Sequence, residues 1–122
     1  MTEIIPLTAA AEWEEIWEEI ASDDAFLRLI FKASPRCPIS RGAEAVFRGF
    51  VSGLDEVPDL EVRIVDVIAS REVSNRIASD TGVKHESPQA LLLGPGREVL
   101  WHAGHIAVSE RNLSEALASA RG

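Results

Sequence analysis

The stretch FKASPRCPIS, residues 31–40, connects two different sequence patterns and contains the chain's only cysteine, Cys37. The preceding residues, FLRLIFKA at positions 26–33, are mostly apolar and predict a strand. The following residues, from Pro38 to about Leu54, carry apolar side chains at helical spacing: Ile39, Ala43, Val46, Phe47, Phe50, Val51 and Leu54. The stretch therefore predicts a strand-to-helix corner, with the thiol where the helix begins.

Similar patterns on both sides of this corner predict the rest of the fold. Strands are predicted at residues 3–6, 26–33, 60–68, 89–93 and 97–102. Helices are predicted at about 9–21 with Thr8 as N-cap, at 38–54, between Ser70 and Gly82, and after Ser109. The order β-α-β-α-β-α-β-β-α predicts parallel strands first and an antiparallel hairpin last. We therefore expect an α/β, thioredoxin-like fold, with a small mixed sheet and helices on both faces, formed by residues 1–122 as one domain.

Composition and charge narrow the classes of function. The chain has 122 residues and a net charge of −8, which argues against nucleic acid or an anionic membrane as a partner. The N-terminus lacks a signal peptide's basic region, and no apolar stretch approaches the roughly 20 residues of a membrane span. A single cysteine forms no disulfide within the chain, so we expect a cytoplasmic protein. An acidic single domain of this size is expected to be a monomer.

The predicted corner gives Cys37 a chemical role. If Cys37 is the N-cap residue and Pro38 the first helical residue, the free N–H groups of Ile39 and Ser40 are available to a negative sulfur. The helix dipole and the neighbouring Arg36 add positive potential, so this position favours the thiolate, the form that attacks disulfides. The alternative is a buried cysteine packed as a small hydrophobe. The polar, proline-rich surroundings favour the reactive thiol.

The motif around the cysteine is CPIS rather than Cys-x-x-Cys. Ser40 stands where a second thiol would be, so no disulfide can close within the motif. This arrangement predicts exchange by one thiol, in which Cys37 takes over the small-thiol half of a mixed disulfide. Ser40 either donates a hydrogen bond to the thiolate or is simply a polar residue of the first helical turn.

A second candidate segment is GVKHESPQALLL, residues 82–93, which places Pro88 just before a strand. In a thioredoxin-like fold, a proline there faces the cysteine corner. A cis Ser87–Pro88 bond would expose the backbone of Ser87 to an extended substrate. His85 and Glu86 either contact the substrate or tune Cys37, or they are ordinary loop residues.

Three segments together, FKASPRCPIS, GVKHESPQALLL and EVLWHAGHIAVSE, resemble the monothiol bacilliredoxins of the thioredoxin superfamily. The resemblance implies an oxidoreductase that removes bacillithiol from client proteins through a Cys37–bacillithiol intermediate. It implies that Cys37 is the nucleophile, that Pro38 and Ser40 complete its motif, and that Pro88 is the cis proline. Bacillithiol would be a co-substrate and no cofactor is expected. The expected partners are bacillithiolated proteins and a low-molecular-weight thiol, and the candidate substrate-binding residues are Arg36, His85, Ser87 and Pro88.

Other readings of the same residues remain open. His102 and His105 have H-x-x-H spacing, but no second cysteine accompanies them, so no metal site is predicted. A lone cysteine can also serve an iron–sulfur cluster shared between two chains, although Pro38 beside it disfavours that mode. The remaining alternative is a thioredoxin-like interaction domain in which Cys37 is incidental.

Overall fold

A computed structural model describes residues 2–54 and 59–121, and within them it forms one five-stranded sheet. The strands are β1 (Ile4–Pro6), β2 (Leu27–Ala33), β3 (Leu60–Asp66), β4 (Gln89–Gly94) and β5 (Glu98–Gly104). The helices are α1 (Ala10–Glu19), α2 (Pro38–Ser52), α3 (Arg71–Thr81) and α4 (Glu110–Ala120). Two short 3-10 helices, η1 (Pro95–Arg97) and η2 (His105–Ala107), flank β5.

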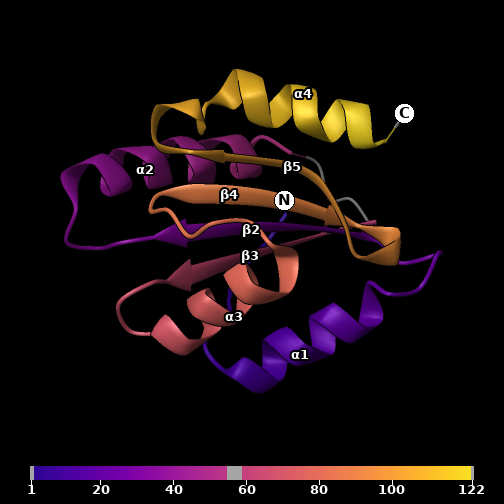
Figure 1. The fold of residues 1–122 in the computed structure, drawn as a ribbon. Helices are drawn as coiled ribbons and strands as arrows, with labels where there is room; N and C mark the ends of the chain where they lie inside the picture. Colours follow the sequence, from indigo (N-terminus) through magenta and orange to yellow (C-terminus); the bar gives the residue numbers. More distant parts are fainter. Residues whose placement is uncertain (1, 55–58, 122) are drawn as a thin grey trace.

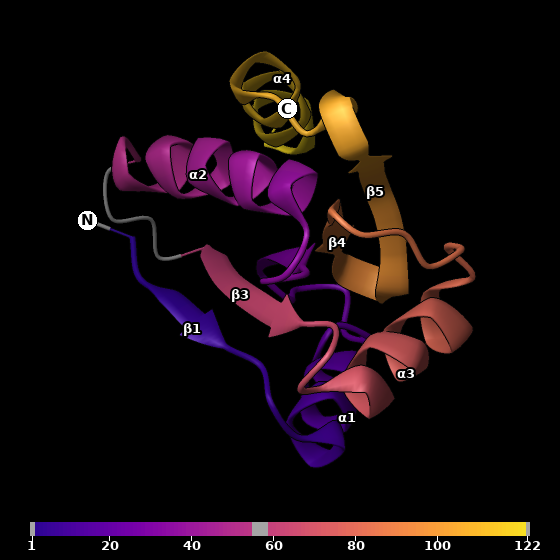
Figure 2. The ribbon, with the colours of Figure 1, turned by 90° about the vertical axis from the view of Figure 1, so that its left-hand side faces the viewer.

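The sheet has the strand order β1-β3-β2-β4-β5, with β2 in its centre. Strand β3 pairs in parallel with β1 and β2, whereas β4 pairs antiparallel with both β2 and β5. Helices α2 and α4 cover one face, and α1 and α3 cover the other (Figures 1 and 2). The predicted element order, the closing hairpin and the thioredoxin-like α/β class are confirmed.

Some element boundaries differ from the prediction. The N-cap of α1 is Ala9 rather than Thr8. The Glu12 carboxylate accepts hydrogen bonds from the backbone N–H groups of both residues. Helix α2 ends at Ser52, two residues before Leu54. Gly82 ends α3 with a φ of 75°, a left-handed conformation that glycine adopts without steric cost.

Alternating side chains of the strands build a hydrophobic core on each face. The core under α2 and α4 contains Leu27, Leu29, Phe31, Ala33, Phe47, Phe50, Val51, Ala90, Leu92, Leu113 and Leu117. The core under α1 and α3 contains Leu7, Trp13, Ile16, Ile20, Ile30, Val65, Val73, Ile77, Leu91 and Leu93. Burial of this apolar surface on both faces stabilises the central strand that leads to Cys37.

Helix α2 is held on β2 by aromatic stacking. The rings of Phe31 and Phe47 stack with centroids 4.5 Å apart. The apolar stripe predicted for this helix is wider than its buried surface, because Ile39 is 62% exposed and Val46 is 40% exposed. The stack fixes the middle of the helix on the central strand.

Candidate active site

Cys37 is the N-cap residue of α2, and Pro38 occupies the first turn of the helix. The corner is closed by a turn in which the Cys37 N–H donates to the Ser34 carbonyl at 3.3 Å. The first helical hydrogen bond follows, from the Arg41 N–H to the Cys37 carbonyl at 2.9 Å. The cysteine is partly exposed at this corner.

The hydroxyl of Ser40 forms a hydrogen bond within the strand-to-helix corner. Ser40 is fully buried, and its Oγ accepts a hydrogen bond of 2.7 Å from the Ser34 backbone N–H. Within the described residues, the side chain of Cys37 accepts no capping hydrogen bond in this structure. Ser40 therefore ties the loop to the first turn of the helix, and in doing so sets the path of the chain around Cys37.

The loop that precedes β4 lies at the same end of the sheet as Cys37, where β2 ends and β4 begins. Strand β4 begins at Gln89, which pairs in register with Lys32 near the carboxyl end of β2. In Figure 1 the end of β2 and the starts of α2 and β4 all lie at the left-hand edge of the sheet. The Ser87–Pro88 bond is cis, and the Pro88 carbonyl accepts a hydrogen bond of 3.0 Å from the His105 N–H. This hydrogen bond joins the loop to η2 beside the corner.

The remaining predicted residues have different surroundings. Arg36 is exposed at the corner. The Ser87 Oγ is buried and has no hydrogen-bond partner among the described residues. His85 extends toward α3, where its Nδ1 lies 3.2 Å from the Ser74 Oγ.

Lys32 is a feature of the site that the sequence analysis did not assign. Its side chain is fully buried on the α1/α3 face, and its Nζ donates to the Ser74 carbonyl at 2.9 Å. The His85 Nδ1 lies 3.4 Å from the same Nζ. Burial lowers the pKa of Lys32 from 10.5 to about 8. The signal was present in FLRLIFKA, since a charged residue in a strand covered on both faces must find polar partners.

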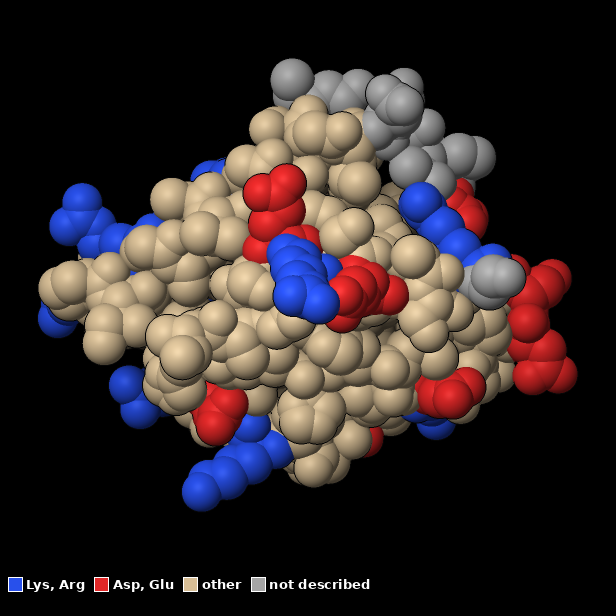
Figure 3. Space-filling model, turned by 90° about the horizontal axis from the view of Figure 1, so that it is seen from above, with Lys and Arg blue, Asp and Glu red and all other residues tan. Residues whose placement is uncertain are grey.

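An apolar groove lies between the start of α2 and the segment around η2. Pro38, Ile39, Gly42, Ala43 and Val46 line one side, and His105, Ile106, Val108, Ser109 and Glu110 line the other. Three apolar side chains are open to solvent in this groove, namely Ile39, Val46 and Ile106, the last of which is 92% exposed. The layer formed by α2 and α4 carries only scattered charged side chains over a largely uncharged surface (Figure 3). The groove begins at the residue that follows Cys37.

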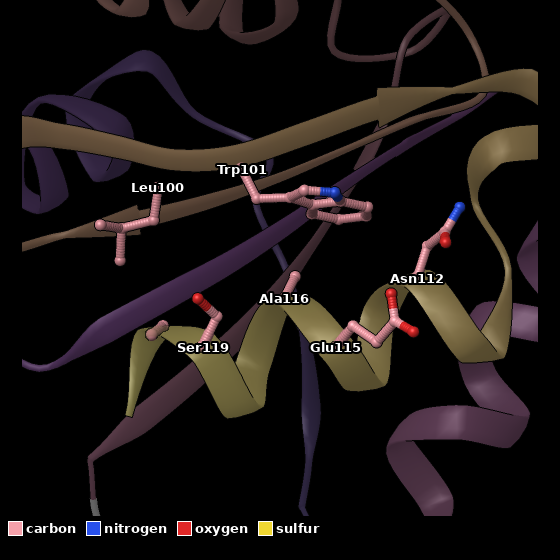
Figure 4. A pocket seen from close by; sticks show the side chains of 7 residues that line it. Leu100, Trp101, Asn112, Glu115, Ala116 and Ser119 are labelled. Carbon is pink, nitrogen blue, oxygen red and sulfur yellow. The ribbon is translucent and has the colours of Figure 1, made fainter. Parts of the chain in front are cut away.

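A second hollow, of about 310 Å³, lies between β5 and α4. Leu100 and Trp101 of β5 face Asn112, Glu115, Ala116 and Ser119 of α4 across it (Figure 4). It includes none of the predicted site residues. Among residues 2–54 and 59–121, no three histidine, cysteine or carboxylate side chains gather as metal ligands would.

The mixed sheet, its four covering helices and a cysteine at the start of α2 define a thioredoxin-fold protein. A solved structure described as having a thioredoxin fold is 28% identical, with a TM-score of 0.75 and 93% of each chain covered. The thioredoxin of Fasciola hepatica is 19% identical, with a TM-score of 0.68 over 94% of this chain and 97% of its own. The thioredoxin of Trypanosoma brucei brucei is 15% identical, with a TM-score of 0.69 over 98% of this chain and 91% of its own.

The family model "Monothiol bacilliredoxin BrxC" matches residues 5–113. The chain therefore belongs to the monothiol bacilliredoxin family of thioredoxin-fold oxidoreductases. In the part of the chain that the structure describes, none of the helices combines the length and hydrophobicity that a membrane span requires.

Proposed function

We propose that this protein removes bacillithiol from protein cysteines by exchange through Cys37 alone. The observation that carries the proposal is the partly exposed thiol at the start of α2, with a serine at the position where a second thiol would resolve it. Ser40 is buried and hydrogen-bonded to Ser34, so this position contributes to the corner without offering a second sulfur. Family membership supports bacillithiol as the small thiol.

The reaction consists of two exchanges. The Cys37 thiolate attacks the bacillithiol sulfur of the client's mixed disulfide, a Cys37–bacillithiol disulfide forms, and the client leaves as a thiolate that takes a proton from solvent. A free bacillithiol thiolate then attacks the bacillithiol sulfur on Cys37. This second exchange releases oxidised bacillithiol and returns the Cys37 thiolate, so one free bacillithiol is consumed for each client disulfide broken and client thiol formed.

Two surfaces support a protein client. The backbone of Ser87, next to the cis Pro88, precedes β4 at the end of the sheet where Cys37 lies, and we propose that an extended segment pairs with it there. The exposed Ile39, Val46 and Ile106 in the groove beside Cys37 offer apolar contacts. We propose Cys37, Pro38 and Ser40 as the catalytic motif, and Arg36, Ser87 and Pro88 as substrate contacts.

The test is intact-mass analysis after mixing the reduced protein with a client protein that carries bacillithiol on one cysteine. Transfer should add one bacillithiol to Cys37 and free the client thiol, and added bacillithiol should then regenerate the starting mass. Cys37→Ser should keep the fold and lose all transfer, because the residue lies at a helix end outside the core. Transfer from a glutathionylated client but not from the bacillithiolated one would refute the substrate. No adduct from either client would refute the exchange activity.

A further inference from the structure

Lys32 is a buried cation that the exchange chemistry does not use. It lies on β2, five residues before Cys37, but alternation along the strand turns it to the α1/α3 face, away from α2. Within the described residues it forms no salt bridge, and its polar contacts are the Ser74 carbonyl and His85 Nδ1. A buried charge without a carboxylate partner is unfavourable for folding, so it calls for an explanation beyond packing.

These contacts converge on the segment 84–89, which contains the Pro88 loop. The His85 Nδ1 lies 3.4 Å from the Lys32 Nζ and 3.2 Å from the Ser74 Oγ. At the other end of the segment, the buried Gln89 donates from its Nε2 to the Lys84 carbonyl at 2.9 Å. Lys32 and Gln89 are register partners on the same face of the sheet, so the cluster lies directly beneath the loop.

We propose that Lys32 is a positioning residue for client binding, which holds the loop 84–88 through His85 in the place where it meets the client beside Cys37. Ser74 completes the tether by accepting the lysine's hydrogen bond on its carbonyl and contacting the imidazole with its hydroxyl. This inference rests on the proposed function, because the client is the molecule that the loop receives. Lys32 itself touches neither the client nor the sulfur.

The protonation states that this tether requires are compatible with neutral pH. The Lys32 ammonium donates to His85 Nδ1 only when the imidazole is neutral and carries its proton on Nε2. Burial, together with the positive charges of Lys32 on β2 and Arg71 on α3, lowers the pKa of His85, while the adjacent Glu86 opposes the shift. Protonation of His85 at acidic pH would turn Nδ1 into a donor facing an ammonium and would break the tether.

Loss of the tether should weaken transfer from a client without slowing the alkylation of Cys37, whereas a general loss of structure would change both rates. Alkylation of Cys37 by iodoacetamide does not need the loop, whereas transfer from a peptide carrying a bacillithiol mixed disulfide does. Lys32→Met and His85→Ala should raise the KM for the peptide by roughly fivefold and leave kcat and the alkylation rate within about twofold. The double variant should be no worse than the poorer single variant, because both remove one tether.

Matched controls and a conservative replacement sharpen the test. Arg111→Met and His102→Ala change an exposed arginine and an exposed histidine outside the segment 84–89, and they should leave the KM unchanged. His85→Gln retains an acceptor for Lys32 and should recover most of the affinity. Acidification below pH 6.5 should raise the KM of the wild-type protein but not that of His85→Gln.

An activity-independent measurement distinguishes failure of this inference from failure of the proposed function. Amide hydrogen exchange in the segment 84–89 should accelerate by roughly tenfold in Lys32→Met and His85→Ala, and not in the two controls. If the wild-type protein transfers no bacillithiol but the exchange result holds, the function is wrong and the tether stands. An unchanged exchange rate and KM in His85→Ala, or a Lys32→Met variant whose alkylation rate falls as far as its client affinity, would overturn the tether.

Discussion

The Ser40 Oγ lies 2.7 Å from the backbone nitrogen of Ser34, and it accepts a hydrogen bond from the loop that leads to Cys37. A helix residue thus anchors the segment before its own N-cap. Cys37 lies between Ser34 and Ser40 in the sequence, so this hydrogen bond limits how far the corner can move.

Replacement of Ser40 by alanine should destabilise the protein. The Ser34 N–H would lose its acceptor in a part-buried position, and we expect Ser40→Ala to lower the free energy of unfolding by about 1–2 kcal/mol. Urea denaturation measures the change. Ser52→Ala is the matched control, since the Ser52 hydroxyl donates to the Gly49 carbonyl on an exposed part of the same helix, and it should cost less than about 0.5 kcal/mol. Equal effects of the two changes would contradict the anchoring role.

The groove beside Cys37 should contribute to client affinity. Ile106 is 92% exposed, so Ile106→Ser should leave the stability unchanged and raise the KM for a protein client by roughly threefold to tenfold, through about 1 kcal/mol of lost apolar contact. Phe26→Ser is the control, because Phe26 is an exposed apolar residue just before β2 begins, at the other end of this strand from Cys37. An Ile106→Ser protein that transfers from protein clients with the wild-type KM would exclude this groove from client binding.

Lys32 should make stability depend on pH in the alkaline range. Its pKa is about 8 in the folded protein and 10.5 as the reference, so the unfolded chain binds more protons between these values. The free energy of unfolding should therefore rise from pH 8 to pH 10.5, by at most about 3 kcal/mol relative to Lys32→Met. Denaturation of both proteins at each pH removes the contributions of other titrating groups. Parallel curves for the two proteins would show that the lysine's charge is not buried.

Glu12 should make the free energy of unfolding depend on pH in the acidic range. Hydrogen bonds from the Thr8 and Ala9 N–H groups, together with the charge of Arg63, lower the pKa of the Glu12 carboxyl from 4.5. Its stabilisation is therefore complete above pH 4.5 and is lost as the pH falls through the folded pKa. Glu12→Gln should cost about 0.5–1 kcal/mol at pH 7, and this cost should shrink as the pH falls below 4.5, as measured by urea denaturation. Glu15→Gln, an exposed change in the same helix, should show no such difference.

The corner and the topology could be predicted because they depend on local signals. Proline after Cys37 marks a helix start, and the GPGR turn between two apolar runs marks the hairpin, whatever packs around them. The candidate residue Cys37 was predicted for the same reason, whereas Pro88 was predicted from its place before a strand in the inferred thioredoxin-like fold. The chemical roles of both residues await the experiments proposed above.

The contacts of individual side chains could not be predicted in this way. The sequence does not reveal that Ser40 turns to Ser34, because this depends on a rotamer and on the path of the preceding loop. The helical spacing also predicted too wide a buried face for α2. Ile39 and Val46 share the spacing of core residues but extend beyond the surface that the sheet covers. The average polarity of the strand FLRLIFKA does not reveal Lys32, because one buried cation hardly changes that average.

The antiparallel pairing of β2 with β4 has a mechanical consequence. The strand that leads to the sulfur and the strand that follows Pro88 are neighbours in one hydrogen-bonded ladder. The corner that carries Cys37 and the loop that carries Pro88 therefore keep a fixed separation. For the function proposed above, a client would meet a preformed surface. Adaptation to clients of different shape would then fall to the client's own chain, which favours modified cysteines on extended or easily unfolded segments.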